Sequence, residues 1–155
     1  QKKFTATCWL RKYSQLDYIE EPDMFHDVFG HVPLLSNREY CAFFQKLGEL
    51  AHANLHNEEV IKQIERLYWF TIEFGLMSEN DGLKIYGAGI ISSHGETLNA
   101  LGNTSKKYPF KLDAVINHDF RNDIIQPEYY VIESFNQLTE ALTDFEKQIN
   151  TRCQQ

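Results

Sequence analysis

The stretch FHDVFGHVPLL, residues 25–35, places His26 and His31 five positions apart in a mostly apolar run. An α-helix turns by about 100° per residue, so side chains five apart point about 140° away from each other. Two ligands of one ion would fit poorly on such a helix. Gly30, however, is well suited to end a helix, and Pro33 opposes its straightforward continuation. We therefore predict that the helix ends at Gly30 and that His31 turns back toward His26.

The histidine pair alone has two interpretations. A histidine at a helix end can interact with the last carbonyl groups and bind nothing else. Alternatively, the pair is half of a metal site that needs a further ligand. The zincin pattern does not apply, because H-E-x-x-H requires histidines four apart with a glutamate after the first, whereas Asp27 follows His26.

Glu73 is the candidate for the missing ligand, because it is the only charged residue in LYWFTIEFGLM, residues 67–77. Burying an unpaired carboxylate is costly. Glu73 is therefore a surface residue on an otherwise packed helix, a salt-bridge partner or a metal ligand. Two histidines and one carboxylate from separate segments match the facial triad of non-haem Fe(II) oxygenases, in which three protein ligands leave coordination positions open.

The composition limits the class of protein. A chain of 155 residues with 43% hydrophobic residues suits a single domain. The net charge of −7 and the lack of a long Lys/Arg cluster argue against binding to nucleic acid or to a membrane surface. No run approaches the roughly 20 apolar residues of a membrane span, and the start lacks a signal peptide. Three widely spaced cysteines indicate a reducing, cytoplasmic setting.

Hydrophobic periodicity favours helices. We predict helices over 39–55, 58–77 and 136–150, and a further one that starts near Ser93, because Ser93 and Glu96 have the spacing of a capping box. The first helix would bury Phe43, Leu47, Leu50 and Leu55. Two short β-rich stretches, 83–87 and 129–135, predict strands. The fold class is therefore mainly α with a small β component.

Four segments together resemble the pterin-dependent aromatic amino acid hydroxylases, and the chain looks closest to the bacterial phenylalanine 4-hydroxylases. They are EEPDMFHDVFGHVPLL (20–35), LYWFTIEFGL (67–76), IYGAGIISSHGE (85–96) and QPEYYVIESF (126–135). The resemblance implies the catalytic-domain fold of that family, with residues 1–155 as a single catalytic domain. The family domain is longer and its pterin-stacking aromatic residue lies upstream, so we expect the N-terminal part of the domain to be missing here.

The resemblance also implies an activity. Fe(II), bound by His26, His31 and Glu73, would act with tetrahydrobiopterin and O₂ to hydroxylate L-phenylalanine to L-tyrosine. The partners would then be small molecules, and the chain would be monomeric. Hydroxylation of tyrosine or tryptophan is an alternative within the family. A non-catalytic iron-binding fragment is an alternative from a different class.

Further residues take roles from the resemblance. Arg11 matches the arginine that holds the substrate carboxylate, which a planar guanidinium can do with two parallel hydrogen bonds. Taken alone, it would be a surface residue. The other substrate-binding positions line the ring pocket or lie close to the iron: Pro22, Trp69, Phe74, Gly89 and Ser92. Asp27 and Tyr68 match positions that face the pterin. Gly87 and Gly89 would permit close backbone approach or an unusual φ.

Overall fold

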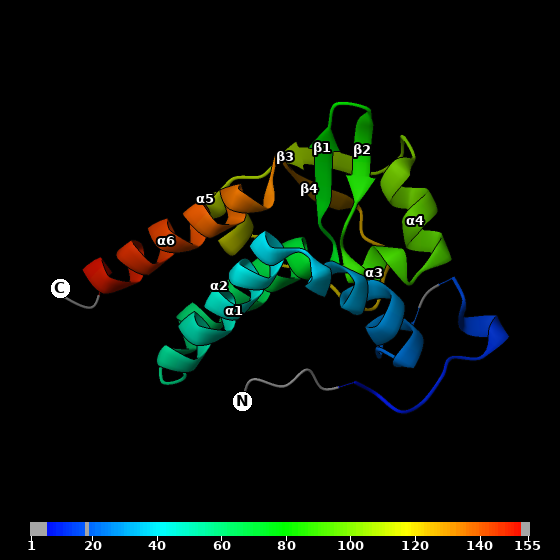
Figure 1. Cartoon of the computed structure of the whole chain (residues 1–155), viewed down its shortest axis with the longest axis horizontal. Helices are drawn as coiled ribbons and strands as arrows, with labels where there is room; N and C mark the ends of the chain where they lie inside the picture. Colours follow the sequence, from blue (N-terminus) through cyan, green and yellow to red (C-terminus); the bar gives the residue numbers. More distant parts are fainter. Residues whose placement is uncertain (1–5, 18, 153–155) are drawn as a thin grey trace.

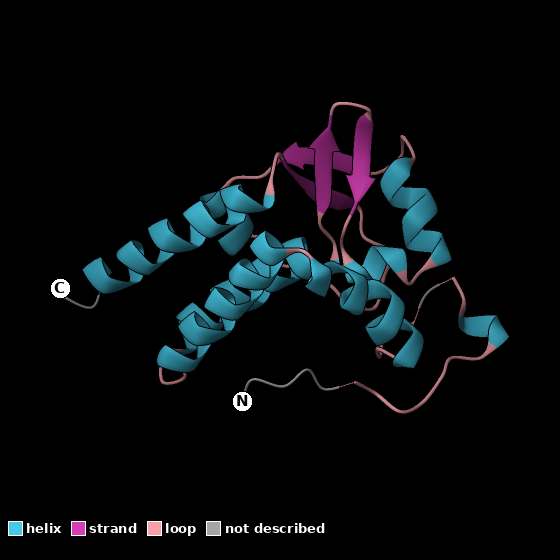
Figure 2. Ribbon diagram, in the orientation of Figure 1, coloured by secondary structure: helices cyan, strands magenta, loops and turns pink. Residues whose placement is uncertain are grey.

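The computed structural model describes residues 6–17 and 19–152 (Figure 1). It is mainly helical with one small sheet, as the sequence predicts (Figure 2). Within this part of the chain, none of the helices combines the length and apolar character that a membrane crossing requires. In chain order the elements are η1 (Tyr13–Gln15), η2 (His26–His31), η3 (Val32–Ser36), α1 (Arg38–Ala53), α2 (Glu58–Tyr68), η4 (Trp69–Glu73), β1 (Leu76–Glu79), β2 (Gly82–Ile85), α3 (Ala88–Ile91), α4 (His94–Leu101), β3 (Lys106–Pro109), α5 (Leu112–Ile116), β4 (Glu128–Ile132) and α6 (Phe135–Arg152).

The long helices α1, α2 and α6 pack through their apolar faces beside the sheet (Figure 1). Asparagines begin α1 and α2, since the side chains of Asn37 and Asn57 accept hydrogen bonds from the backbone N–H three positions on. The helices share one core, whose fully buried members include Phe43, Leu67 and Phe145. This core supports the C-terminal end of α2, from which η4 continues toward the sheet.

The sheet has four strands in the order β2-β1-β4-β3. β1 and β2 form an antiparallel hairpin, whereas β4 pairs in parallel with both β1 and β3. The hairpin turns at Asn80-Asp81-Gly82, and Gly82 has φ 123°, a backbone conformation that favours glycine. A second apolar cluster joins the sheet to α3 and α4 through Leu76, Ile90, Ala100 and Tyr129.

The structure corrects several predicted boundaries. The helix predicted over 58–77 ends at Glu73, because β1 begins at Leu76. The strand predicted over 129–135 ends at Ile132, and α6 begins at Phe135. Leu55 lies beyond the end of α1 and is 67% exposed, so it does not belong to the core. The start of α4 after Ser93 is confirmed, since Ser93 Oγ accepts a hydrogen bond from the Glu96 N–H.

Candidate metal centre

The segment that carries both histidines is a π-helix, so the predicted helix end at Gly30 is wrong. Residues His26–His31 form η2, and the N–H of Val32 donates to the carbonyl of Asp27 five positions back. In a π-helix the hydrogen bonds run from i to i+5, so residues five apart share one side of the helix. Pro33 does not end the helical path either, because it occupies the first turn of η3, where a missing N–H is tolerated. The wider helix turn, and not a helix break, brings His31 beside His26.

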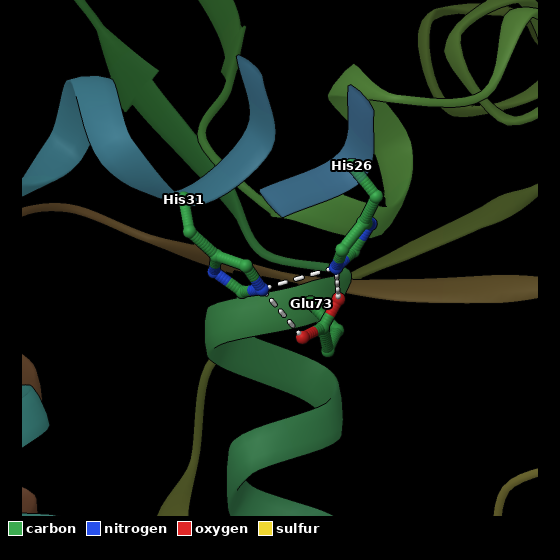
Figure 3. Close-up of side chains that lie close together, drawn as sticks. All are labelled: His26, His31 and Glu73. Carbon is green, nitrogen blue, oxygen red and sulfur yellow. Dashed lines mark hydrogen bonds and ion pairs between the residues drawn. The ribbon is translucent and has the colours of Figure 1, made fainter. Parts of the chain in front are cut away.

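Glu73 is placed by a second π-helix. It is the last residue of η4, and the N–H of Phe74 donates to the carbonyl of Trp69, again five positions back. Segments of this kind are rare and occur frequently at functional sites. The widened turn directs the Glu73 carboxylate toward η2 (Figure 3).

Glycines allow the three segments of the site to approach closely. A Cβ on Gly30 of η2 would lie 2.9 Å from the Cβ of Ala88 in α3. A Cβ on Gly87 would lie 2.4 Å from the carbonyl oxygen of Glu73. Gly89 lies against Phe74 and the same carbonyl group. The predicted close approach at Gly87 and Gly89 is confirmed, and neither residue has a positive φ.

The ligand atoms of His26, His31 and Glu73 converge (Figure 3). The two Nε2 atoms are 3.0 Å apart, and they lie 3.5 and 3.2 Å from the Glu73 carboxylate oxygens for His26 and His31 respectively. All three side chains are buried. Among the described residues, this is the one group of three His, Cys, Asp or Glu side chains whose ligand atoms all lie within 4.8 Å of one another.

This geometry fits a metal ion. Two ligand atoms that bind one ion at right angles, each at about 2.1 Å, lie about 3.0 Å apart. Burial lowers the pKa of His26 and outweighs the neighbouring Glu73 carboxylate, which would raise it, so the neutral imidazole that binds metal is favoured. Burial alone would raise the pKa of Glu73, but its interactions with His31, His26 and Tyr68 together outweigh burial and lower that pKa. A carboxylate and two imidazole lone pairs so close together need a proton or a cation among them.

Ser92 and Asp23 fix the position of His26. Ser92 Oγ lies 2.8 Å from His26 Nδ1. With the Nδ1–H donating to Ser92, Nε2 keeps its lone pair for a metal. Asp23 accepts a hydrogen bond of 2.9 Å from the His26 backbone N–H at the start of the helix. This bond holds the first turn of the segment in place.

Arg11 is buried and paired with Asp23. Its Nε and Nη2 donate to the carboxylate of Asp23 at 3.0 and 2.7 Å, and its Nη1 donates to the carbonyl of Ser92. Burial alone would raise the pKa of Asp23, but hydrogen bonds from the Arg11 side chain and from the His26 and Arg11 backbones hold it well below its ordinary value. Arg11 is not among the residues that line the pocket described next.

A pocket of about 300 Å³ opens beside the triad. Of the residues proposed from the sequence, those that line it are Pro22, His26, Tyr68, Trp69, Glu73, Phe74, Gly89 and Ser92. The sequence reasoning missed Ile19, Glu20 and Ser93, which complete the lining. Glu20 and Ser93 lie in two of the segments that carry the resemblance, but Glu20 belongs to an acidic pair typical of a solvated turn and Ser93 has the spacing of a helix cap, so neither takes a site role from the sequence. Ile19 lies just outside those segments.

The two residues expected to face a pterin differ in their surroundings. Burial and the neighbouring Glu73 carboxylate raise the pKa of Tyr68 well above its ordinary value, so this pocket phenol stays protonated. Asp27 is buried, and its carboxylate accepts hydrogen bonds from the backbone N–H and the hydroxyl of Thr7, at 2.6 and 2.9 Å. Asp27 therefore ties the described start of the chain to η2.

A family model described as "Biopterin-dependent aromatic amino acid hydroxylase" matches residues 1–154. The chain belongs to this family. Phenylalanine-4-hydroxylase from Ralstonia nicotianae is 43% identical to this member over 143 residues, which are 90% of this chain and 45% of that protein. The human phenylalanine-4-hydroxylase is 39% identical over 92% of this chain and 31% of that protein.

Solved structures of the family agree with this fold. A crystal structure of phenylalanine hydroxylase from Chromobacterium violaceum, with bound iron(III) and oxidised cofactor 7,8-dihydrobiopterin, superimposes with a TM-score of 0.81 and 39% identity. It matches 92% of this chain and 53% of that chain. Another structure of that protein is bound to cobalt, with a TM-score of 0.82. This family member spans about half the length of the bacterial relatives it matches.

Proposed function

We propose that His26, His31 and Glu73 bind one Fe(II), and that the protein hydroxylates L-phenylalanine to L-tyrosine with O₂ and tetrahydrobiopterin. The observation that carries this proposal is the buried two-histidine, one-carboxylate triad at the wall of an aromatic-lined pocket. Such a triad is typical of non-haem Fe(II) oxygenases. The iron and dihydrobiopterin bound by the Chromobacterium violaceum enzyme support the same cofactors here.

The pocket residues bind and orient the aromatic ring. Trp69 and Phe74 contact each other, with ring centroids 4.5 Å apart, and Pro22 lines the same cavity. These apolar walls exclude water and hold a ring beside the ligand atoms of His26 and Glu73. Gly89 carries no side chain and leaves room at the wall, while Ser92 keeps His26 oriented. When bound, Fe(II) with the pterin supplies the activation of O₂.

Arg11 holds the substrate carboxylate. Each of its two terminal nitrogens carries two N–H groups, so bonds to Asp23 and Ser92 leave the guanidinium further donors. Tyr68 contacts the pterin directly from the pocket wall, and Asp27 acts on it through a water molecule. The partners are small molecules, and the protein works as a monomer in the cytoplasm without nucleic acid or membrane.

A metal titration tests the centre. The full chain should bind about one Fe(II) or Co(II) per molecule, and His31→Ala should abolish binding, because it removes one of three ligands. His118→Ala is the matched control, since His118 bonds Glu128 and Tyr130 away from the triad. Equal metal binding by His31→Ala and the unmodified chain would contradict the site.

Turnover is tested by following tyrosine formation from phenylalanine with Fe(II), O₂ and a tetrahydropterin. Omission of the pterin or the His31→Ala substitution should abolish it. Tyrosine and tryptophan as substrates in parallel test the alternatives within the family. Stoichiometric iron binding without hydroxylation of any of the three amino acids would support the non-catalytic alternative and contradict the proposed activity.

A further inference from the structure

A fully buried carboxylate lies outside the metal centre, on α4. Glu96 accepts hydrogen bonds from the Gln126 backbone N–H at 2.7 Å and from the Tyr129 hydroxyl. The side chain of Asn99, one turn along α4, donates to the Gln126 carbonyl at 2.7 Å and to the Tyr129 hydroxyl at 2.8 Å. Both polar groups of the Gln126 backbone are therefore held by side chains of one helix.

The side chain of Gln126 extends this network to the pocket wall. Its Oε1 accepts a hydrogen bond of 3.1 Å from the indole Nε1–H of Trp69, and its Nε2 donates to the carbonyls of Arg121 and Ile124 at 2.8 and 2.9 Å. Only 3% of Gln126 is exposed, so water cannot replace these bonds freely. Hydrogen bonds therefore hold both the backbone of Gln126 and its side-chain Nε2, so the Oε1 that accepts from the Trp69 indole has a fixed position.

Trp69 is the residue through which this network can act on a ligand. It lines the pocket beside the triad and contacts Phe74 at a centroid separation of 4.5 Å. It also stacks on Phe120, with centroids 4.4 Å apart and an angle of 14° between the rings. Ring contacts leave the indole free to slide or turn in its own plane, whereas a hydrogen bond to Nε1–H fixes the in-plane orientation.

We propose that Glu96 and Gln126 are positioning residues that hold the Trp69 indole in one orientation and so determine which aromatic ring the pocket accepts. The part concerning the ring rests on the proposed function. Glu96 orients the Gln126 backbone, and the Gln126 amide orients the indole. Neither residue touches the substrate, so both act on ring choice through Trp69.

The first test reads Trp69 directly and needs neither iron nor substrate. The protein has two tryptophans, so its ¹⁵N–¹H spectrum should contain two indole signals, and that of Trp9 serves as an internal reference. Gln126→Met removes the acceptor while keeping the size of the side chain. The Trp69 indole signal should shift upfield and exchange with solvent about tenfold faster, with the Trp9 signal unchanged. An unchanged Trp69 signal would overturn the proposal.

A matched control separates positioning from a general effect on folding. Gln63 is also a glutamine with 3% exposure, but it lies in α2 and bonds Arg152. Gln63→Met should leave the Trp69 signal in place, and a shift equal to that of Gln126→Met would overturn the proposal. If Gln126→Met does not fold, two substitutions of Glu96 test the proposal instead. Glu96→Leu should shift the Trp69 signal. Glu96→Gln keeps an acceptor for the Gln126 N–H, so the Trp69 signal should stay at its position in the unmodified protein.

The second test measures ring choice. Dissociation constants of L-phenylalanine and L-tryptophan are determined by calorimetry on the Fe(II)-loaded protein. The ratio of the two constants should change about fivefold in Gln126→Met, as expected for the loss of one buried hydrogen bond, and remain unchanged in Gln63→Met. A constant ratio would overturn the claim on ring choice. Failure of the unmodified protein to bind either amino acid would contradict the proposed function. The Trp69 signal would still test whether Glu96 and Gln126 hold the indole in one orientation.

Discussion

The hydroxyl oxygen of Ser92 lies 2.8 Å from Nδ1 of His26, although the two residues are 66 positions apart in the chain. Because Ser92 follows α3, the loop after this short helix determines the ring orientation of a candidate ligand in η2. Outer hydrogen bonds of this kind orient metal-binding histidines and increase their basicity.

Ser92→Ala should therefore weaken iron binding without removing a ligand. We expect the affinity for Fe(II) to fall about 10- to 100-fold, the usual effect of losing an outer partner of a metal-binding histidine. Competition with a chromophoric chelator measures this affinity.

Ser93→Ala is the matched control for that experiment. Ser93 caps α4 through the Glu96 N–H at 3.2 Å, so its loss should lower the free energy of unfolding by about 1 kcal/mol. Its hydroxyl forms no hydrogen bond with the triad, and the affinity for iron should not change. If both alanine variants lose iron equally, Ser92 has no particular role in orienting His26.

Gly87→Ala should destabilise the protein by about 3 kcal/mol, near the upper end of the usual cost of overpacking. The added Cβ would lie 2.4 Å from the carbonyl oxygen of Glu73 and 2.5 Å from the Gly75 nitrogen, and both are backbone atoms that cannot rotate away. Urea unfolding measures the change in the free energy of unfolding. Movement of the Glu73 backbone should also weaken iron binding.

Gly48→Ala should have the opposite effect on the stability of the protein. Gly48 lies within α1, and a Cβ there has no atom outside its own helix within 4 Å. Alanine in a helix interior should increase the free energy of unfolding by about 0.5–1 kcal/mol relative to glycine. A similar loss of stability in both variants would show that close packing at Gly87 is not the cause.

Arg11→Met should lower the free energy of unfolding by about 3–5 kcal/mol, because it leaves the buried carboxylate of Asp23 without its charged partner. Arg121→Met removes an arginine that is paired with Asp123 on the surface, and its unfolding midpoint in urea should not change measurably. A comparable effect of the two substitutions would mean that the Arg11–Asp23 pair contributes no more than a surface pair.

Periodicity predicted the long helices because each buries one stripe of apolar residues against the common core. It did not predict β1 and β3, whose four-residue sequences LMSE and KKYP show no clear alternation. Their pairing with β4 depends on distant contacts that a local pattern cannot contain. The end of the 58–77 helix was misplaced for the same reason, since the apolar run continues unchanged from η4 into β1.

The candidate site followed from composition more than from geometry. Glu73 could be selected because it is the only charge in its run, and the histidines because two of them lie close together in a mostly apolar segment, although their spacing of five argued against one regular helix. The π-helical turns could not be foreseen, because a change of hydrogen-bond register from i+4 to i+5 leaves no mark in the hydrophobic pattern. Glu96 has the spacing of a capping-box partner, but its carboxylate bonds Gln126 and Tyr129, which only the folded chain brings close.

Glu96 also makes stability depend on pH in a predictable direction. Burial raises its pKa above the ordinary 4.5, against hydrogen bonds from Tyr129 and the Gln126 N–H that lower it. Above pH 4.5 the unfolded chain has released this proton while the folded chain still holds it, so folding loses stability as pH rises toward the folded-state pKa.

Glu96→Gln has no proton to release. The free energy of unfolding of Glu96→Gln minus that of the unmodified protein should therefore increase between pH 4.5 and pH 7.5, as measured by urea unfolding. The exposed Glu65→Gln gives the effect of losing one surface carboxylate, to be subtracted at each pH. A corrected difference that stays constant or falls with pH would show that burial does not raise the pKa of Glu96.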